Sequence, residues 1–542
     1  MSRLRQDTST ALFTISQWSN SFALINRIPL ELLSLIPTYL PSRKDRLRAS
    51  FVCRHWRKTF LQRAELWSQL YLSQKSDEVY AETFLERAKG SALDVTVGCM
   101  APVRFMALLS SRAEQIKHVH FPHNSWKDVE NFSKAIPGSF PLLHSLEITA
   151  VVRDNPIDVN MNMTTPSLAL PFSNAINLKT FHYHLNSDWA PPLNHFLFPN
   201  LASLVFSAWQ LDLFPGSELL GFLENSPMLR TVHIEINARI SLEGVHQDWM
   251  VVLPNVEAFS LVACNGGLSH KIATHISCPS ARSISLKQSM CAVDLIPDDY
   301  FPPPVSWNAI VRQYTRGPAE DVTLEIKKGY IIACKLTFKS AGATIIELCF
   351  NIDVEDEDDD EDKDEDSPLS VRMYNEIFTQ ATRTIRNHLQ LADIKRLHFR
   401  HSFRSIRVAE VSHITSEAGR LFKSLGPLDE LTIHDCNLRP CFHHYFGPSA
   451  DGIGEPVVFP QVKELTISSP LFPSYDESIA PITRLARAQH TLGIPFGRVV
   501  FRWEGMSDVV SAVSEELRPW VGSVECYGEG LWGVEDYWDF MT

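Results

Sequence analysis

One strand-like phrase recurs along this chain and restricts the folds that the chain can adopt. An apolar residue is followed by further apolar residues three and five positions later, and the phrase starts at Ile116, Leu143, Leu178, Leu201, Leu229, Val256, Ala281, Ile394, Leu428 and Val462. Successive copies lie 27, 35, 23, 28, 27, 25, 113, 34 and 34 residues apart. Alternating apolar residues indicate a strand with one buried face, and a single such unit cannot bury that face alone. The sequence therefore predicts stacked strand units that share a core.

This phrase and its spacing resemble the irregular leucine-rich repeats of F-box proteins, in particular the long, weakly conforming kind of mushroom-forming fungi. Asn124, Cys264 and Cys436 stand three residues after the last strand apolar, where that family uses Asn or Cys to satisfy turn backbone groups. The resemblance implies an α/β solenoid with a mainly parallel sheet, behind a helical N-terminal domain, so that the chain as a whole is of the α+β or α/β class. Return helices are expected in the segments that begin at Ser217, Ser416 and Ser478.

Residues 25–72 carry more apolar residues than a free-standing unit of this size can bury. We expect three short helices there. The first follows Pro29, and the second starts with a capping box of Ser42 and Asp45. The apolar stripes are Leu32, Leu33, Ile36 and Leu40 on the first helix and Ala49, Cys53, Trp56 and Phe60 on the third. A chain of about 40 residues rarely stands alone, so a partner protein is expected.

The same residues resemble an F-box in their order and spacing. The matching runs are Ile28-Pro29-x-Glu31-Leu32-Leu33, Ile36, Tyr39-Leu40-Pro41, Asp45-Arg46-Leu47-Arg48, Val52-Cys53-Arg54-x-Trp56-Arg57 and Leu66-Trp67. The resemblance implies binding to the Skp-type adaptor of a Skp–cullin–F-box ubiquitin ligase and, through the adaptor, to a cullin. The implied adaptor-binding residues are Ile28, Pro29, Leu32, Ile36, Leu47, Val52 and Trp56. Ile28 replaces a more usual Leu, which conserves volume. The alternative is a first helical hairpin of a larger helical domain.

Polar residues alternate with the apolar ones in each strand phrase, so they are expected to point away from the core and to line an exposed sheet face. The candidate substrate-binding residues are His118, His120, Glu147, His182, His233, Arg396, His398, Glu430 and Glu464. A hydrated sheet face and a surface that recruits a protein substrate both fit this pattern. Our hypothesis is that the face as a whole recruits a substrate that the sequence does not name.

The residue patterns, together with the resemblance to F-box proteins with repeats, divide the chain into six segments. Residues 1–24 form either a disordered leader or a helix against the F-box, which Phe13, Ile15 and Trp18 favour, and residues 25–72 form the F-box itself. The repeat array occupies residues 73–299 and 368–542, and its second part opens with an amphipathic helix after Pro368 and ends in a strand–helix–strand cap from Arg498. Residues 300–352 alternate as hairpin-connected strands, and residues 353–367 form an acidic loop.

The formal net charge of −13 is almost entirely local. Residues 353–366 hold twelve carboxylates and one lysine, so the remainder has 51 acidic and 49 basic residues. A nearly neutral body offers no long-range field for nucleic acid. The acidic run is interpreted as a solvated loop, with recruitment of a basic partner as the alternative. Because no run reaches the roughly 18 apolar residues of a membrane span and the cysteines are scattered, we expect no membrane partner and a location in the cytoplasm or nucleus.

Motifs for catalysis are missing from the sequence, including G-x-S-x-G, the P-loop, G-x-G-x-x-G and H-E-x-x-H. Cys436, Cys441, His443 and His444 lie close together without the second half of a zinc site. We therefore expect no enzyme activity, cofactor or metal in this chain. Two alternatives to a substrate receptor stay open. The first is an interaction scaffold that does not lead to degradation, and the second is an enzyme hidden in residues 300–420, where the phrase lapses.

Overall fold

The structure is a computed structural model in which parts of the chain are described. The described residues are 2–22, 28–40, 43–72, 77–98, 103–124, 126–136, 140–151, 172, 175–186, 193, 197–241, 243–263, 269–291, 319–328, 331–340, 345–353, 379, 381–383, 385–386, 394–402, 420–422, 424–435, 461–469, 475–503 and 507–527. The chain divides into two compact units, Met1–Phe206 and Ser207–Thr542, and each is described by itself.

The first unit opens with short helices. They are α1 (Ser2–Phe22), α2 (Leu30–Leu35), the 3-10 helix η2 (Ile36–Tyr39), α3 (Arg43–Ser50), α4 (Arg54–Gln62) and the 3-10 helix η3 (Ala64–Trp67). Both α2 and α3 pack against α4. The predicted stripe from Ala49 to Phe60 does not lie on one helix, because Phe51 and Val52 form a turn and Cys53 is extended, with φ −157°. This turn separates α3 from α4.

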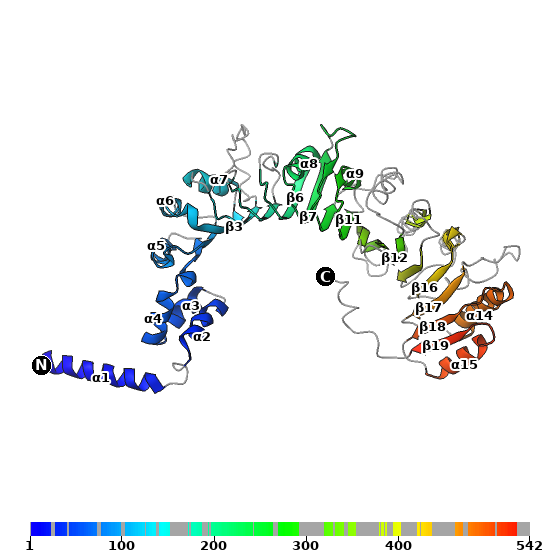
Figure 1. Cartoon of the computed structure of the whole chain (residues 1–542), viewed down its shortest axis with the longest axis horizontal. Helices are drawn as coiled ribbons and strands as arrows, with labels where there is room; N and C mark the ends of the chain where they lie inside the picture. Colours follow the sequence, from blue (N-terminus) through cyan, green and yellow to red (C-terminus); the bar gives the residue numbers. More distant parts are fainter. Residues whose placement is uncertain are drawn as a thin grey trace, which may run out of the picture. The chain divides into compact units, whose positions relative to one another are not determined.

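A parallel sheet follows the helices in the first unit. Its strands, paired in this order, are β1 (Gln69–Leu72), β2 (Leu93–Val97), β3 (Ile116–Asn124), β4 (Ser145–Val151) and β5 (Thr180–Asn186). The connecting helices include α5 (Asp77–Ala88), α6 (Val103–Ser110), η4 (Ala113–Gln115) and α7 (Trp126–Ala135). Figure 1 shows α6 and α7 together on one side of β3. Parallel pairing requires such crossover connections, and the helices cover the apolar face that the strands present to them.

Alternate residues of these strands form the core. Val119, Phe121, Leu146 and Ile148 are buried, whereas the intervening polar residues are half-exposed. Each of the ten phrases coincides with a strand in the described structure, which confirms the predicted strands and their buried face. The last of these in the first unit, β6 (Ser203–Pro215), contains the boundary between the two units.

The second unit contains two blocks of parallel strands. The first block pairs β7 (Thr231–Ser241), β9 (Ala258–Ala263) and β11 (Ser283–Cys291). The second pairs β15 (Arg396–Ser402), β16 (Leu428–Asp435), β17 (Val462–Ser469), β18 (Arg498–Trp503) and β19 (Ser523–Tyr527). Smaller elements of the first block are α8 (Gly216–Glu224), α9 (Ser269–Thr274) and the short strand pair β8 (Val251–Val252) and β10 (Ile276–Ser277).

Three antiparallel strands connect the two blocks. They are β12 (Ala319–Lys328), β13 (Ile331–Ser340) and β14 (Ile345–Asp353), and they pair in sequence as a meander. The last of them, β14, lies parallel to β11, and the first, β12, lies parallel to β15. Antiparallel pairing agrees with the alternating pattern of this segment. The order of strands across the sheet is therefore β11, β14, β13, β12 and β15, so the meander runs across the sheet in the reverse of its order along the chain.

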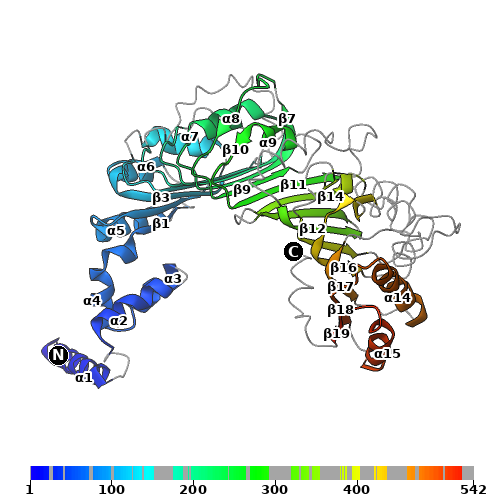
Figure 2. The same ribbon diagram turned by 45° about the vertical axis from the view of Figure 1, so that its right-hand side comes forward.

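The end of the second unit is a compact strand–helix–strand arrangement, as the sequence predicted. Helices α14 (Tyr475–Thr491) and α15 (Ser507–Leu517) pack together, and Figure 2 shows both on one side of the strands β16 to β19. Glycine is required at the start of β19. A Cβ added to Gly522 would lie 2.5 Å from the carbonyl oxygen of Gly497, a distance at which the backbone itself must shift.

Several predicted features lie outside the described residues. These are residues 354–366 of the acidic run, most of the helix after Pro368, and Cys264, Cys436, Cys441, His443 and His444. Asn124 is described and fully buried, but its amide makes no hydrogen bond within the described chain. Across the residues that the structure describes, no helix combines the length and apolar character needed to cross a membrane.

Candidate functional site

Helix α2 exposes much of its apolar surface. Leu30, Leu32 and Leu35 are each about half exposed, with Leu32 at 55%, whereas Leu33 is fully buried. The local cause is the start of the helix, where the Leu33 N–H donates to the Pro29 carbonyl over 2.9 Å and directs Leu33 inward. A short helix that presents three leucines to solvent is typical of a surface that a partner covers.

The turn between α3 and α4 exposes a second apolar pair. Phe51 is 65% and Val52 is 56% exposed. Their backbone N–H groups donate to Arg48 and Ala49 carbonyls over 2.9 and 3.2 Å, which fixes the turn. The Arg57 guanidinium lies 5.0 Å from the Phe51 ring centroid. These side chains therefore occupy defined positions on an ordered turn.

The predicted adaptor-binding residues divide by exposure. Pro29, Leu32 and Val52 are exposed, while the side chains of Ile28, Ile36 and Leu47 are half-buried. Trp56 is only 5% exposed, and its ring centroid lies 5.6 Å from that of Phe60. The indole of Trp56 is therefore part of the internal packing of α4, and its contact with an adaptor stays a prediction. Its buried Nε1 has no hydrogen-bond partner in the described chain.

An aromatic core supports this helical surface from behind. Trp67 is buried and donates from Nε1 to the Phe60 carbonyl over 2.9 Å. The Trp67 ring also meets Phe84 of α5 edge to face at 4.9 Å between centroids. Edge-to-face pairs add to the burial energy. The helices and the first sheet strands of this unit therefore share one core.

Helix α1 contacts α4 through one described aromatic contact. The Arg54 guanidinium lies 3.7 Å from the centroid of the Phe13 ring. Ile15 and Trp18 are exposed. The expected helix is therefore present, and Phe13 lies against Arg54 of α4.

The first candidate substrate face lies on the sheet of the first unit. His118 pairs with Asp94 at 3.8 Å and His120 with Glu147 at 3.5 Å, and His182 is the register neighbour of Glu147. Burial lowers the pKa of His118 below its usual value, although Asp94 acts in the opposite direction. The His118 ring is consequently mainly neutral near pH 7 and can both donate and accept hydrogen bonds.

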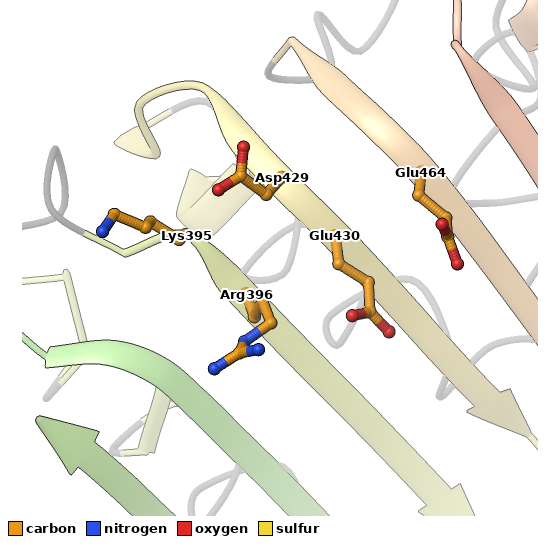
Figure 3. A pocket seen from close by; sticks show the side chains of 5 residues that line it. All are labelled: Lys395, Arg396, Asp429, Glu430 and Glu464. Atoms are coloured by element: carbon orange, nitrogen blue, oxygen red, sulfur yellow. The ribbon is translucent and has the colours of Figure 1, made fainter. Parts of the chain in front are cut away.

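The second candidate face lies on the sheet of the second unit. Arg396, Glu430 and Glu464 are direct register neighbours on β15, β16 and β17. Figure 3 shows the three side chains projecting from the same face of these strands. His398 lies two residues after Arg396 on the same strand face, and His233 is on β7 beside Ser260 of β9. The structure therefore brings three of the nine predicted residues into one row and leaves His233 apart from it.

Three charged residues of this second face were not identified from the sequence. Asp321 on β12 contacts Arg396 at 3.5 Å, and Arg498 on β18 contacts Glu464 at 3.1 Å and also pairs with Glu525 on β19. The strand phrase could have identified two of them, Arg498 and Glu525. Phe496, Val499 and Phe501 repeat the strand phrase, which puts Arg498 at the position of Arg396, and Val521, Val524 and Cys526 repeat it again before and after Glu525. Asp321 belongs to the reversed meander, where the phrase is absent.

The charged face has the chemistry of a binding surface. Within the residues described, no group of three or more His, Cys, Asp or Glu side chains is arranged to hold a metal ion. A hollow of about 390 Å³ lies at this face and is lined by Lys395, Arg396, Asp429, Glu430 and Glu464 (Figure 3). Paired acids and bases of this kind bind charged side chains of a partner through complementary potentials.

Comparison with known proteins identifies the helical domain. No curated protein matches the chain. Residues 25–73 match the family model described as F-box-like, and they contain α2, α3, α4 and the exposed apolar residues of α2 and of the turn between α3 and α4. F-box domains generally bind Skp-type adaptors, and such a domain suggests an adaptor-binding substrate receptor of Skp–cullin–F-box ligases. The chain thus carries an F-box-like domain near its N-terminus, and a mostly parallel α/β sheet region follows it. The family match supports the interpretation of the chain as an F-box protein.

Proposed function

We propose that this chain is the substrate-recognition subunit of a Skp–cullin–F-box type ubiquitin ligase. Helix α2 and the turn between α3 and α4 bind the adaptor, and the adaptor connects the chain to a cullin. The polar strand faces hold a protein substrate close to the ubiquitin-charged partner. The chain contributes proximity and orientation, because the transfer chemistry resides on other subunits. It acts in the cytoplasm or nucleus and is not itself an enzyme.

Bare apolar surface on the F-box-like domain is the observation that carries this proposal. Leu32 and Val52 are 55% and 56% exposed within a domain whose interior is packed by Phe60 and Trp67. Leaving such side chains in water costs roughly 25 cal/mol for each Å² that a partner could cover. The same side chains occupy F-box positions for adaptor contact, so the two observations point to one surface.

Support for the proposed binding of a substrate by the sheet region comes from the strand phrase. Its spacing and its polar face resemble a leucine-rich repeat array, whose sheet face commonly binds proteins. Parallel strands with alternate polar residues half-exposed, such as His120 and Glu147, are compatible with that reading. We therefore include leucine-rich repeats of the fungal F-box kind in the proposal, with a substrate of unknown identity.

The test is reconstitution with a purified Skp-type adaptor. We expect a stable one-to-one complex, and a Leu32→Asp, Val52→Asp double variant is expected to lose about 100-fold or more in affinity, since both changes put charges into an apolar contact. Leu492→Asp is the matched control, because Leu492 is an exposed leucine of the second unit. Titration calorimetry measures the affinities and circular dichroism checks that each variant is folded. Equal affinity of the double variant and the wild type would contradict the proposed surface.

The alternative function uses the same surfaces without degradation. An interaction scaffold would bind the adaptor but would not assemble with a cullin. Co-purification of adaptor and cullin with the wild-type chain, and loss of both with the double variant, would favour the ligase. Recovery of adaptor without cullin would favour the scaffold.

A further inference from the structure

One face of the second unit carries a row of charged side chains in register. The row, called here the charged row, runs across β12, β15, β16, β17 and β18 and consists of Asp321, Arg396, Glu430, Glu464 and Arg498. Residues that are direct register neighbours in a sheet are close enough to interact, so the order of charges along the row sets its potential. The two ends of this row differ in the balance of acidic and basic side chains.

Basic groups are in excess at the β12 end. The Asp321 carboxylate, whose side chain is 9% exposed, lies 3.5 Å from Arg396, 3.6 Å from His398 and 4.0 Å from Lys339. One carboxylate therefore faces two permanent cations and a histidine. Lys395 and Asp429, which also line the hollow, add one charge of each sign and leave this balance unchanged. This end has a positive potential that Asp321 does not cancel.

Acidic groups are in excess at the β17 to β19 end. The Arg498 guanidinium donates to Glu464 and to Glu525, so one cation serves two carboxylates. Glu430 accepts a hydrogen bond from the Thr432 hydroxyl at 2.9 Å and has no ion-pair partner in the part of the chain that the structure describes. Glu464 and Glu525 thus share a single guanidinium, and Glu430, the register neighbour of Glu464, adds a further carboxylate. This end has a negative potential.

The hollow of about 390 Å³ lies where the two ends meet, with Arg396 on one side and Glu430 and Glu464 on the other (Figure 3). A ligand with one sign of charge, such as a nucleic acid or a polybasic tail, would be attracted by one half and repelled by the other. A ligand with both charges, correctly spaced, is attracted by both. The geometry favours a mixed-charge partner.

We propose that this hollow binds an extended segment of a protein with an acidic and a basic side chain two residues apart. The acidic side chain lies against Arg396, and the basic side chain lies between Glu430 and Glu464. Neighbouring strands are about 4.8 Å apart, so the row steps from Arg396 by about 5 Å to Glu430 and about 10 Å to Glu464. Side chains two positions apart on one side of an extended peptide are separated by about 7 Å, which falls between these distances. The segment crosses the strands, and the assignment of its source to a ligase substrate rests on the proposed function.

The test uses photo-crosslinking peptides with the full-length chain. Five peptides of glycine and serine carry a central benzoylphenylalanine flanked by Glu and Lys, Lys and Glu, two Glu, two Lys, or two Gln. We expect both mixed-charge peptides to crosslink about fivefold more than the Gln peptide, because one exposed charge pair contributes about this factor in affinity. Mass-spectrometric mapping should place the crosslinks on β15–β17. A duplex DNA oligonucleotide is expected to give no crosslink there. Equal yields for all peptides, a preference of the wild type for two Lys or two Glu, or attachment elsewhere would overturn the proposal.

Charge-changing variants predict a specific exchange of preference. Arg396→Glu makes the row acidic and should favour the peptide with two Lys. Glu430→Lys with Glu464→Lys makes it basic and should favour the peptide with two Glu. Glu430→Gln removes the charge of a half-buried carboxylate while keeping its shape, and should lower the mixed-charge preference alone. Glu257→Lys, exposed before β9, is the matched control and should behave as wild type.

Adaptor binding by the same protein preparations separates the two proposals. Peptide discrimination without adaptor binding would leave this inference intact and remove the ligase function. Adaptor binding without peptide discrimination would remove this inference alone. Variants that change peptide preference are expected to bind the adaptor with unchanged affinity.

Discussion

The F-box-like domain and the charged row expose opposite kinds of surface. Around α2, leucines stand in water above a packed aromatic core, and a partner gains by covering apolar area whatever its charge. Along the charged row, Asp321, Arg396, Glu464 and Arg498 are already paired within the chain, so a partner must replace existing ion pairs with matching ones. Apolar exposure therefore suits one constant partner, and paired charges suit a choice among several partners. The following measurements test this difference, from the largest expected effect to the smallest.

Replacing Trp56 with alanine should cost the F-box-like domain about 3–5 kcal/mol of stability, because the indole is buried beside Phe60. Hydrogen exchange of peptides covering α3 and α4 measures the loss, and peptides from β15 to β19 provide the internal control. If Trp56→Ala kept its protection from hydrogen exchange but lost adaptor binding, the indole would belong to the adaptor interface. The prediction that it stabilises the core would then be wrong.

Removing the central carboxylate of the basic end should cost about 1–3 kcal/mol. In Asp321→Asn, Arg396 and Lys339 lose a partner whose side chain is only 9% exposed. Urea unfolding followed by exchange of β12 and β15 peptides measures the change. Asp429→Asn is the control, since Asp429 is exposed beside Lys463, and no measurable change is expected there. Equal loss for both would mean that burial does not set the strength of these pairs.

Salt should separate the two surfaces directly. Raising the ionic strength from about 0.05 M to about 0.5 M shortens the screening length to a few Å, so crosslinking of mixed-charge peptides should fall about fivefold. Adaptor affinity should change by less than about twofold, because apolar burial is not screened. Parallel titrations on one protein preparation give both values. Strong salt dependence of adaptor binding would show that charge contributes to both surfaces.

Acid should weaken the acidic end of the row. The hydrogen bond from Arg498, together with one from the Tyr527 hydroxyl, lowers the pKa of Glu525. A lowered folded-state pKa contributes stability that is present above the unfolded value of about 4.3 and is lost as the pH falls through the folded value. The difference in urea midpoint between wild type and Glu525→Gln should therefore be present at neutral pH and shrink below about pH 4. A difference that is independent of pH would assign the effect to packing.

Local patterns in the sequence predicted a large part of this structure. The alternation within a phrase such as Leu428-x-x-Leu431-x-Ile433 determines both the strand and its buried face, because both depend on neighbouring residues alone. The break at Cys53 was not predicted, since Ala49, Trp56 and Phe60 have helical spacing across it. Helix and turn compete there, and the packing of α3 and α4 decides between them.

Contacts between distant segments could not be predicted in the same way. The sequence of residues 319–353 does not determine that β14 pairs with β11 and β12 with β15, because every strand edge offers the same backbone hydrogen-bonding groups. The charged row depends on that choice, since Asp321 meets Arg396 only in this order. The burial of Trp56 could not be predicted for a related reason, because an aromatic residue at a motif position can pack inward or outward.

The reversed meander also affects how the chain is made. During synthesis the edge of β11 stays open while β12 and β13 emerge, and it closes only when the ribosome has released β14. An exposed parallel edge is a site for mispairing and aggregation. Strand β15 is then added to β12, which was translated before β14 closed the edge of β11. Truncations within the meander should leave a nascent chain that depends on chaperones, whereas truncations after β14 should be released in a soluble form.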